Sequence, residues 1–176
     1  KIKFYNISKL NRSYEKIFIK NFRLINNSGK YILGKKVDEF EKNFARYCKS
    51  KYCIAVGNCV DAIKLSFMAF KILRKMREGD EVLVPANTYI ASILGITSVN
   101  LKPKFVEPDP ETFNISLKNI KKSITKKTKG ILIVDLYGHP ADLLEIKNFA
   151  KKKRIHLIED AAQSLGAKIN KKMIGS

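Results

Sequence analysis

Two adjacent acids and an amide follow an apolar run near the end of the chain. The segment IEDAAQSLGA starts at Ile158 and contains Glu159, Asp160 and Gln163. A carboxylate at the end of a buried strand is costly unless it has a charged partner. A protonated ring nitrogen would be such a partner for Asp160, and the Gln163 amide, about one helical turn further on, could bind the same ligand. A plain helix cap is the alternative role for Asp160.

A strand-to-helix turn earlier in the chain could hold a phosphate. The segment GNCVDAIKL starts at Gly57, and Cys59, Val60 and Asp61 open the expected helix. The first backbone N–H groups of a helix have no intrahelical partners, and the helix dipole favours an anion there. The segment is neither G-x-G-x-x-G nor a Walker loop, so an ordinary helix start is the alternative.

Two further loops carry an aromatic ring and an imidazole. In PANTYIAS, Thr88 could cap a helix that Tyr89 opens, and the tyrosine could stack on a planar ring or pack in the core. In YGHPAD, His139 could act as acid or base, or have only solvent and backbone partners. A phosphate, a flat ring and a ring nitrogen that needs a carboxylate together describe pyridoxal 5'-phosphate, whose protonated ring accepts carbanion electrons.

These loops need a scaffold that brings strand ends together. Apolar periodicity and turn residues predict helices at 8–22, 35–48, 60–73, 89–99, 117–124 and 142–152, strands at 52–56, 81–84, 102–106, 129–136 and 154–158, a turn at 26–29 and a hairpin after residue 166. Strands separated by helices imply an α/β fold with a mainly parallel sheet and helices on both faces. Ligands of such sheets bind outside the carboxyl ends of the strands, where the candidate residues lie.

Composition argues against several other classes of protein. The chain has 176 residues and is 45% hydrophobic, which suits one globular domain or part of a larger one. No apolar run approaches the roughly 18 residues of a membrane span, and the opening KIKFYNISKL lacks a signal-peptide core. The three cysteines are too few for a disulfide framework and lack zinc-ligand spacing. We expect a cytoplasmic protein with no metal and no membrane partner.

The net charge of +19 raises the possibility of nucleic-acid binding. Most of the basic residues are lysines spread along the chain, and no RNP, helix-turn-helix or zinc-finger pattern accompanies them. We therefore expect a solvated basic surface that helps attract a phosphate-bearing substrate, and no nucleic-acid partner. A basic nucleic-acid-binding domain is the hypothesis that a salt-dependent DNA-binding assay would test.

Six segments resemble one enzyme family. They are, in chain order, YILGKKVDEFEKNFARYC, YCIAVGNCVDAIKL, EGDEVLVPANTYIAS, PKFVEPDPETFNI, LYGHPADL and IEDAAQSLGA. They look like the DegT/DnrJ/EryC1/StrS sugar aminotransferases, whose members are fold-type-I pyridoxal-phosphate enzymes. The combination of GNCVDA, PANTY and EPDPETFNI looks most like the branch that acts at C3 of nucleotide-linked 3-keto-6-deoxyhexoses. The resemblance spans nearly the whole chain.

The resemblance implies a role for each candidate residue. Asp160 would pair with the pyridine nitrogen, Gln163 would bond the ring hydroxyl, and Tyr89 would stack on the ring. Backbone amides of Val60 and Asp61 would hold the phosphate. Many members have Thr at the position of Val60, so a hydroxyl contact to the phosphate is absent here. The implied cofactor-binding set is Cys59, Val60, Asp61, Tyr89, Asp160 and Gln163.

The resemblance also implies parts that this chain lacks. The family's Schiff-base lysine lies a few tens of residues beyond the Asp-Ala-Ala-Gln motif, and the chain stops at Ser176. We expect an N-terminal helical segment at 1–30 and an incomplete pyridoxal-phosphate-binding large domain at 31–176, truncated before the C-terminal small domain. The lysines in the expected hairpin follow the motif too closely to be nominated: Lys168, Lys171 and Lys172.

Two hypotheses about activity follow from the resemblance. In the first, the chain is the N-terminal portion of an aminotransferase that moves an amino group from an amino-acid donor, expected to be glutamate, to a nucleotide-linked keto-deoxysugar. Such a reaction would serve the biosynthesis of amino sugars for lipopolysaccharide and other surface polysaccharides. In the second, the chain is a catalytically incompetent fragment or remnant of such an enzyme. The resemblance implies a homodimer for the intact enzyme and no activity for the 176 residues alone.

Overall fold

The computed structural model describes residues 4–175. They form two compact units, which we describe separately. The smaller unit comprises residues 4–46 together with Tyr52–Ala55, and the larger comprises Tyr47–Lys51 together with residues 56–175. Among the helices of the described chain, none is both long and apolar enough to cross a membrane.

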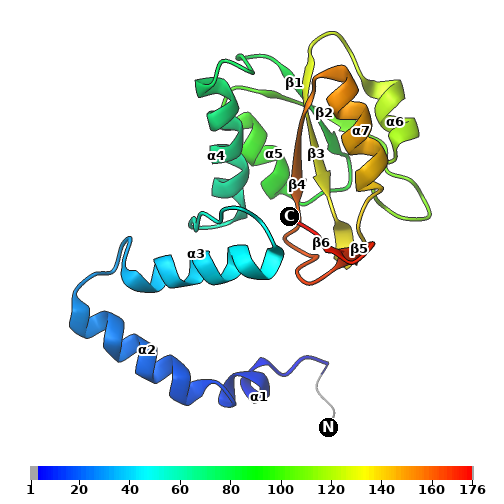
Figure 1. The fold of residues 1–176 in the computed structure, drawn as a ribbon. Coiled ribbons are helices and arrows are strands. Elements are labelled where there is room, and N and C mark those ends of the chain that lie inside the picture. Colours follow the sequence, from blue (N-terminus) through cyan, green and yellow to red (C-terminus); the bar gives the residue numbers. More distant parts are fainter. Residues whose placement is uncertain (1–3, 176) are drawn as a thin grey trace. The chain divides into compact units, whose positions relative to one another are not determined.

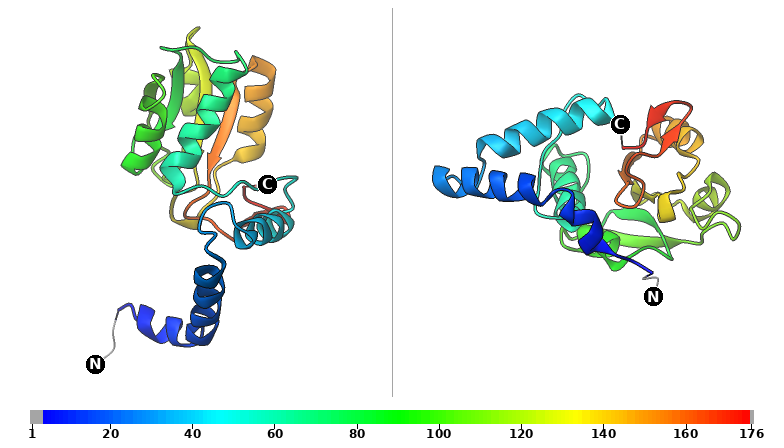
Figure 2. Two further views of the ribbon diagram at one scale, coloured as in Figure 1. Left: turned by 90° about the vertical axis from the view of Figure 1, so that its left-hand side faces the viewer. Right: turned by 90° about the horizontal axis from the view of Figure 1, so that it is seen from below.

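The larger unit is a three-layer α/β structure. Its parallel sheet has the strand order β2-β1-β3-β4 (Figure 1). The strands are β1 (Glu81–Pro85), β2 (Lys102–Val106), β3 (Thr128–Val134) and β4 (His156–Asp160). The helices are α4 (Cys59–Ile72), α5 (Ile90–Thr97), α6 (Leu117–Ser123) and α7 (Leu143–Lys153). Helices α4 and α5 cover one face of the sheet and α6 and α7 cover the other; Figure 2 gives two further views of these layers. The predicted α/β fold with a mainly parallel sheet is confirmed.

The core forms because both faces of the sheet are covered. Side chains of a strand alternate between its two faces, so a strand buried on both sides is apolar at nearly every position, as ILIV in β3 is. The cluster beneath α4 and α5 includes Phe67, Val82, Val84, Ile96, Leu132 and Val134. The cluster beneath α6 and α7 includes Leu83, Ile120, Ile131, Ile133, Ile146 and Ala150.

Helices α4 and α5 approach each other closely at Gly95. A Cβ atom built on this glycine would lie 2.5 Å from Cγ2 of Ile63 on α4, so no larger residue fits without movement. The absence of a side chain lets the two helices pack tightly.

The end of the described chain forms the predicted hairpin. Strands β5 (Lys168–Ile169) and β6 (Lys172–Met173) pair antiparallel. The two residues between them, Asn170 and Lys171, both have positive φ, 48° and 67°. This geometry is that of a two-residue hairpin turn whose twist matches the strands, and asparagine tolerates it well.

The smaller unit is helical and departs from the prediction at two points. It contains α1 (Ile7–Arg12), α2 (Glu15–Ser28) and most of α3 (Lys35–Cys48). The single helix expected at 8–22 is broken at Ser13, whose hydroxyl donates to the carbonyl of Leu10 and competes with the helical pattern. The turn expected at 26–29 forms only at Gly29, because α2 continues to Ser28 and ends on this left-handed glycine, φ 63°.

The strand predicted at 52–56 is wrong, since the segment is irregular. Its five residues are all apolar, which favoured a strand, yet Tyr52 is 72% exposed and Ile54 is 80% exposed. The Ala55 N–H donates to Glu41 Oε1 at 2.7 Å. A strand requires a neighbour that supplies ladder hydrogen bonds, and none of the described strands pairs with this segment. The other predicted helices and strands of the sheet unit are present, with ends shifted by a few residues.

Candidate functional site at the carboxyl ends of the strands

The strand order reverses direction between β1 and β3. From β1 the chain passes through α5 to β2 on one side, and from β3 it passes through α7 to β4 on the other. Parallel sheets bind ligands outside the carboxyl ends of their strands at such a point. Asp135 directly follows β3 and Asp160 ends β4, and the Asp135 N–H donates to the Asp160 carbonyl at 3.1 Å. Two carboxylates therefore lie at this edge of the sheet.

Asp160 is held by donors from three different elements. Its Oδ1 accepts from the Ala162 N–H at 3.2 Å and from the Cys59 thiol on α4 at 3.4 Å. Its Oδ2 accepts from the Ser92 hydroxyl on α5 at 3.2 Å. The residue is only 8% exposed. The bond to Ala162 closes a turn rather than capping a helix, because the residues that follow β4 form turns.

The donors around Asp160 carry no charge. None of the ion pairs within residues 4–175 involves this carboxylate. A buried carboxylate without a countercharge is costly, and its hydrogen bonds offset only part of that cost. Of the roughly four acceptor positions of a carboxylate, three are used, which leaves one for a further donor. Asp160 therefore fits a protonated ring nitrogen, which supplies both the missing charge and the missing donor.

Cys59 is a hydrogen-bond donor in this site. Burial raises the pKa of its thiol to about 11, and the neighbouring Asp160 carboxylate adds to the shift. The thiol therefore stays protonated near neutral pH and is a poor nucleophile. The sequence placed Cys59 at a helix start; its contact with Asp160 was not predicted.

The start of α4 already has an internal cap. The Asn58 Oδ1 accepts from the Asp61 N–H at 2.9 Å, and the Asn58 Nδ2 donates to Asp61 Oδ2 at 3.0 Å. A Cβ on Gly57 would lie 2.9 Å from Asp61 Oδ2, so a larger residue there would displace this carboxylate from the cap. The Asp61 N–H, which was expected to bind a phosphate, thus already donates to the cap. Of the two backbone amides expected to bind the phosphate, the Val60 N–H remains available.

The first turn of α5 differs from the prediction in its cap. Thr88 does not cap the helix; its Oγ1 lies 2.8 Å from Ser92 Oγ. Tyr89 occupies the cap position without a side-chain bond, and its carbonyl accepts from the Ser92 N–H at 3.1 Å. The Tyr89 side chain is 72% exposed, so it is not a core residue. An exposed aromatic ring thus belongs to the same helical turn as a donor to Asp160.

Gln163 has a defined amide orientation. Its Oε1 accepts from the Tyr137 N–H at 2.7 Å, and because a backbone nitrogen only donates, the oxygen must face it. The Nε2 group is then the part of the amide that can donate to a ligand. Tyr137 has φ 55°, a left-handed conformation that directs its N–H to Gln163. The helical spacing expected between Asp160 and Gln163 is absent, because turns connect them.

His139 contributes backbone contacts to the loop after β3. Its N–H donates to the Leu136 carbonyl at 2.9 Å, and its carbonyl accepts from Asn114 Nδ2 at 2.8 Å. The residue is exposed. These contacts fit the structural alternative stated for it and place no acid–base partner on its imidazole.

A second acidic pair beside the site was missed by the sequence analysis. Asp135 Oδ1 accepts from the Ala141 N–H at 2.9 Å, and Glu159 Oε2 accepts from the Gly175 N–H at 2.9 Å. Glu159 Oε1 is buried without a hydrogen-bond partner among the described residues. Burial, followed by the charge of Asp135, raises the pKa of Glu159 to about 7, and burial also raises the pKa of Asp135. The pair therefore retains a proton that isolated carboxyls would lose.

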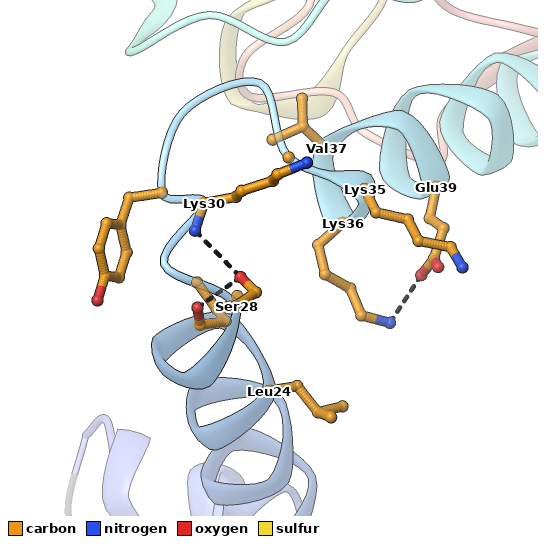
Figure 3. Close-up of a pocket in the computed structure, with 10 residues that line it drawn as sticks. Leu24, Ser28, Lys30, Lys35, Lys36, Val37 and Glu39 are labelled. Atoms are coloured by element: carbon orange, nitrogen blue, oxygen red, sulfur yellow. Dashed lines mark hydrogen bonds and ion pairs between the residues drawn. The ribbon is translucent and has the colours of Figure 1, made fainter.

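The smaller unit contains a separate hollow of about 370 Å³ at the junction of α2 and α3 (Figure 3). Its lining includes Leu24, Ser28, Lys30, Lys36 and Glu39. The ammonium group of Lys36 pairs with Glu39 at 2.7 Å. The hollow contains none of the residues singled out in the sequence.

Fold and site together define an α/β protein with a ligand position at the switch point of a parallel sheet, built around a carboxylate that lacks a cation. The sequence pattern of the DegT/DnrJ/EryC1/StrS aminotransferase family matches residues 13–176, and the chain belongs to this family. The resemblance stated from the sequence is confirmed.

Individual relatives agree with this assignment. The chain is 45% identical over 175 residues to a dTDP-3-amino-3,6-dideoxy-alpha-D-galactopyranose transaminase of Aneurinibacillus thermoaerophilus. This match covers 99% of this chain and 47% of that protein. It superposes on S. venezuelae DesV, solved in complex with a ketimine intermediate, with a TM-score of 0.92 and 33% identity over 99% of this chain and 46% of DesV. It superposes on Bacillus subtilis NtdA, solved with bound pyridoxamine phosphate, with a TM-score of 0.87 and 31% identity. This match covers 98% of this chain and 39% of NtdA. The chain spans about half, or less than half, of the length of the curated relatives that it matches.

Proposed function

We propose that this chain supplies the cofactor-binding part of a pyridoxal-phosphate-dependent sugar aminotransferase. The observation that carries the proposal is the buried Asp160 carboxylate, which has three uncharged donors and no cation within the described residues. A protonated pyridine nitrogen is the partner that this donor set lacks. The bound pyridoxamine phosphate of NtdA and the ketimine complex of DesV support the same cofactor.

Each site residue has a proposed role toward the cofactor. Asp160 keeps the proton on the ring nitrogen, and Gln163 donates from Nε2 to the ring oxygen. Tyr89 covers one face of the ring. The start of α4 binds the phosphate through Cys59, Val60 and Asp61, with Asn58 releasing the Asp61 amide when the phosphate is present. The bound cofactor supplies an electron sink for the carbon that gains or loses the amino group. We also propose that residues 31–176 are the cofactor-binding domain and residues 1–30 a helical segment.

The proposed substrates are a nucleotide-linked keto-deoxysugar and an amino-acid donor such as glutamate. The transaminase activity in the name of the Aneurinibacillus relative supports the sugar nucleotide, and the +19 charge would help attract its phosphates. We propose a cytoplasmic homodimer that serves the synthesis of lipopolysaccharide or another surface polysaccharide. The lysine that carries the cofactor would lie outside these 176 residues, so the chain alone would bind cofactor weakly and have no turnover.

Cofactor binding and turnover test the proposal. The protein that contains this chain, produced at its full encoded length, should bind pyridoxamine phosphate and aminate a dTDP-linked keto-deoxysugar with glutamate as donor. Asp160→Asn should keep the fold and lower turnover at least about a hundredfold, because the charged partner of the ring nitrogen is lost. Asp142→Asn, at an exposed position without a side-chain capping bond, is the matched control. Near wild-type turnover in Asp160→Asn would refute the role of Asp160.

The same binding experiment addresses the second hypothesis, a catalytically incompetent remnant. A remnant would keep the fold yet show no turnover at full encoded length. Binding without turnover would favour a protein that retains the cofactor site and has lost the reaction. Turnover would exclude the remnant.

A further inference from the structure

Two hydroxyl groups form a chain that ends on the Asp160 carboxylate. Ser92 lies in the first turn of α5, is 1% exposed, and places its Oγ 3.2 Å from Asp160 Oδ2. Thr88, just before the helix, places its Oγ1 2.8 Å from Ser92 Oγ. A buried serine hydroxyl inside an apolar helix needs a partner, and here it has one on each side. The contacts join the loop after β1 to the end of β4.

The direction of these bonds follows from counting protons. A hydroxyl has one proton to donate, and a carboxylate has none. If Ser92 donates to Asp160 Oδ2, its proton is used, and it can only accept from Thr88. The chain therefore runs from the Thr88 hydroxyl to the Ser92 hydroxyl to Asp160 Oδ2. Hydrogen bonds aligned in this way polarise and strengthen one another.

We propose that Ser92 and Thr88 are positioning residues for Asp160. Oδ1 is held by Cys59 and Ala162, but the Ser92 hydroxyl is the only donor to Oδ2 among the described residues. Rotation of a carboxylate about its last side-chain bond is soft, so the bond to Oδ2 fixes the plane of the group. Thr88 acts one step further away by fixing the direction of the Ser92 proton. The inference rests on the proposed function, in which this carboxylate faces the ring nitrogen.

The chain offers matched controls for both hydroxyls. Ser92→Ala and Thr88→Val each remove one hydroxyl of this hydrogen-bond relay from Thr88 through Ser92 to Asp160. Ser98→Ala and Thr97→Val make the same changes at the other end of α5, where the hydroxyls donate to helix carbonyls, Ser98 to Gly95 at 3.2 Å and Thr97 to Ile93 at 3.1 Å. The controls leave Asp160 untouched. Thermal unfolding of all four variants without cofactor shows whether a substitution lowers the stability of the whole fold.

Two readouts apply to the full-length protein. One is the dissociation constant of pyridoxamine phosphate, and the other is the nitrogen-15 NMR shift of its labelled ring nitrogen, which separates protonated from neutral rings. Ser92→Ala should weaken binding about tenfold, equivalent to about 1.4 kcal/mol, and move the shift toward the neutral ring. Thr88→Val should weaken binding about threefold. Ser92→Thr, which keeps the hydroxyl, should restore the protonated signal.

A double variant tests whether Thr88 acts through Ser92. In the Ser92→Ala background, Thr88→Val should cause no further loss of cofactor affinity, since the hydrogen bond from Ser92 to Asp160 is already absent. Additive effects, or a Ser92→Ala variant that matches Ser98→Ala in both readouts, would overturn the relay while leaving the cofactor proposal intact. A wild-type protein that binds no pyridoxamine phosphate would overturn both. If Ser92→Ala fails to fold, Thr88→Val against Thr97→Val decides the matter.

Discussion

Cys59 and Asp160 are 101 positions apart in the sequence, yet the thiol of the first donates to Oδ1 of the second at 3.4 Å. The bond joins the helix start proposed to bind phosphate to the carboxylate proposed to meet the ring nitrogen. The two ends of the proposed ligand are thus held by directly bonded residues. A shift of α4 would therefore disturb both.

The first prediction concerns the reactivity of Cys59. Because burial and Asp160 raise the pKa of its thiol to about 11, iodoacetamide should label Cys59 slowly at about pH 8, where an ordinary cysteine is partly ionised. Asp160→Asn removes the neighbouring charge and should accelerate labelling several-fold. Peptide mapping by mass spectrometry gives the rate at each cysteine. Labelling of Cys59 as fast as that of a cysteine in an unfolded peptide would contradict the prediction.

The second prediction concerns Tyr89. Tyr89→Ala should weaken pyridoxamine phosphate binding by about 1–2 kcal/mol, because stacking and apolar contact with the ring are lost. Stability without cofactor should change little, since the side chain is 72% exposed. Tyr89→Phe should keep the affinity, and Tyr31→Ala, at a 67% exposed tyrosine of the smaller unit, is the control. Equal affinities in a fluorescence titration would show that Tyr89 does not stack on the ring.

The third prediction concerns the acid pair. Glu159 binds its proton more tightly in the folded chain than in the unfolded chain, because its pKa rises from 4.5 to about 7. The contribution of this proton to stability is therefore present at low pH and is lost as pH rises from 4.5 through about 7. Glu159→Gln mimics the protonated acid, so it should exceed the wild type in stability above about pH 7, by on the order of 1 kcal/mol given partial solvent screening.

Urea unfolding across this pH range measures the effect of Glu159→Gln. The two proteins should converge below the lower end of the range, where wild-type Glu159 is protonated in both states. Glu111→Gln, at an exposed position outside the helices, should follow the wild type throughout. A constant difference at all pH values would mean that the substitution alters packing rather than proton binding.

The fourth prediction concerns the contact of α4 and α5. Gly95→Ala should destabilise the fold by about 1–3 kcal/mol, because the new Cβ would lie 2.5 Å from Ile63 Cγ2. Ile63→Ala removes that methyl group, although the Cβ of residue 63 would still lie 2.8 Å from the new atom, and by itself it leaves a cavity. The double variant should therefore be more stable than the sum of the single effects predicts, as denaturant titrations can measure. Strict additivity would show that the helices separate without strain.

The sequence anticipated the sheet better than it anticipated the site contacts. The strand at 102–106 was predicted with its observed ends, because a turn precedes it and prolines follow it. The segment at 52–56, YCIAV, is more apolar than KPKFV at 102–106 and yet is not a strand, since pairing depends on a neighbour that local sequence does not specify. Ser92 was overlooked because a serine in an apolar helix is unremarkable until the fold brings Asp160, 68 positions away, to its hydroxyl.

The position of β4 in the sheet affects how firmly Asp160 is held. Among the described strands β4 pairs only with β3, so its other edge has no ladder partner. Amides that face an open edge exchange with solvent without cooperative unfolding, and such strands are the first to open. Asp160 therefore belongs to a segment whose protection against hydrogen exchange depends on whatever covers that edge. A chain or subunit that covered it would slow exchange along β4 and rigidify the carboxylate without contacting it.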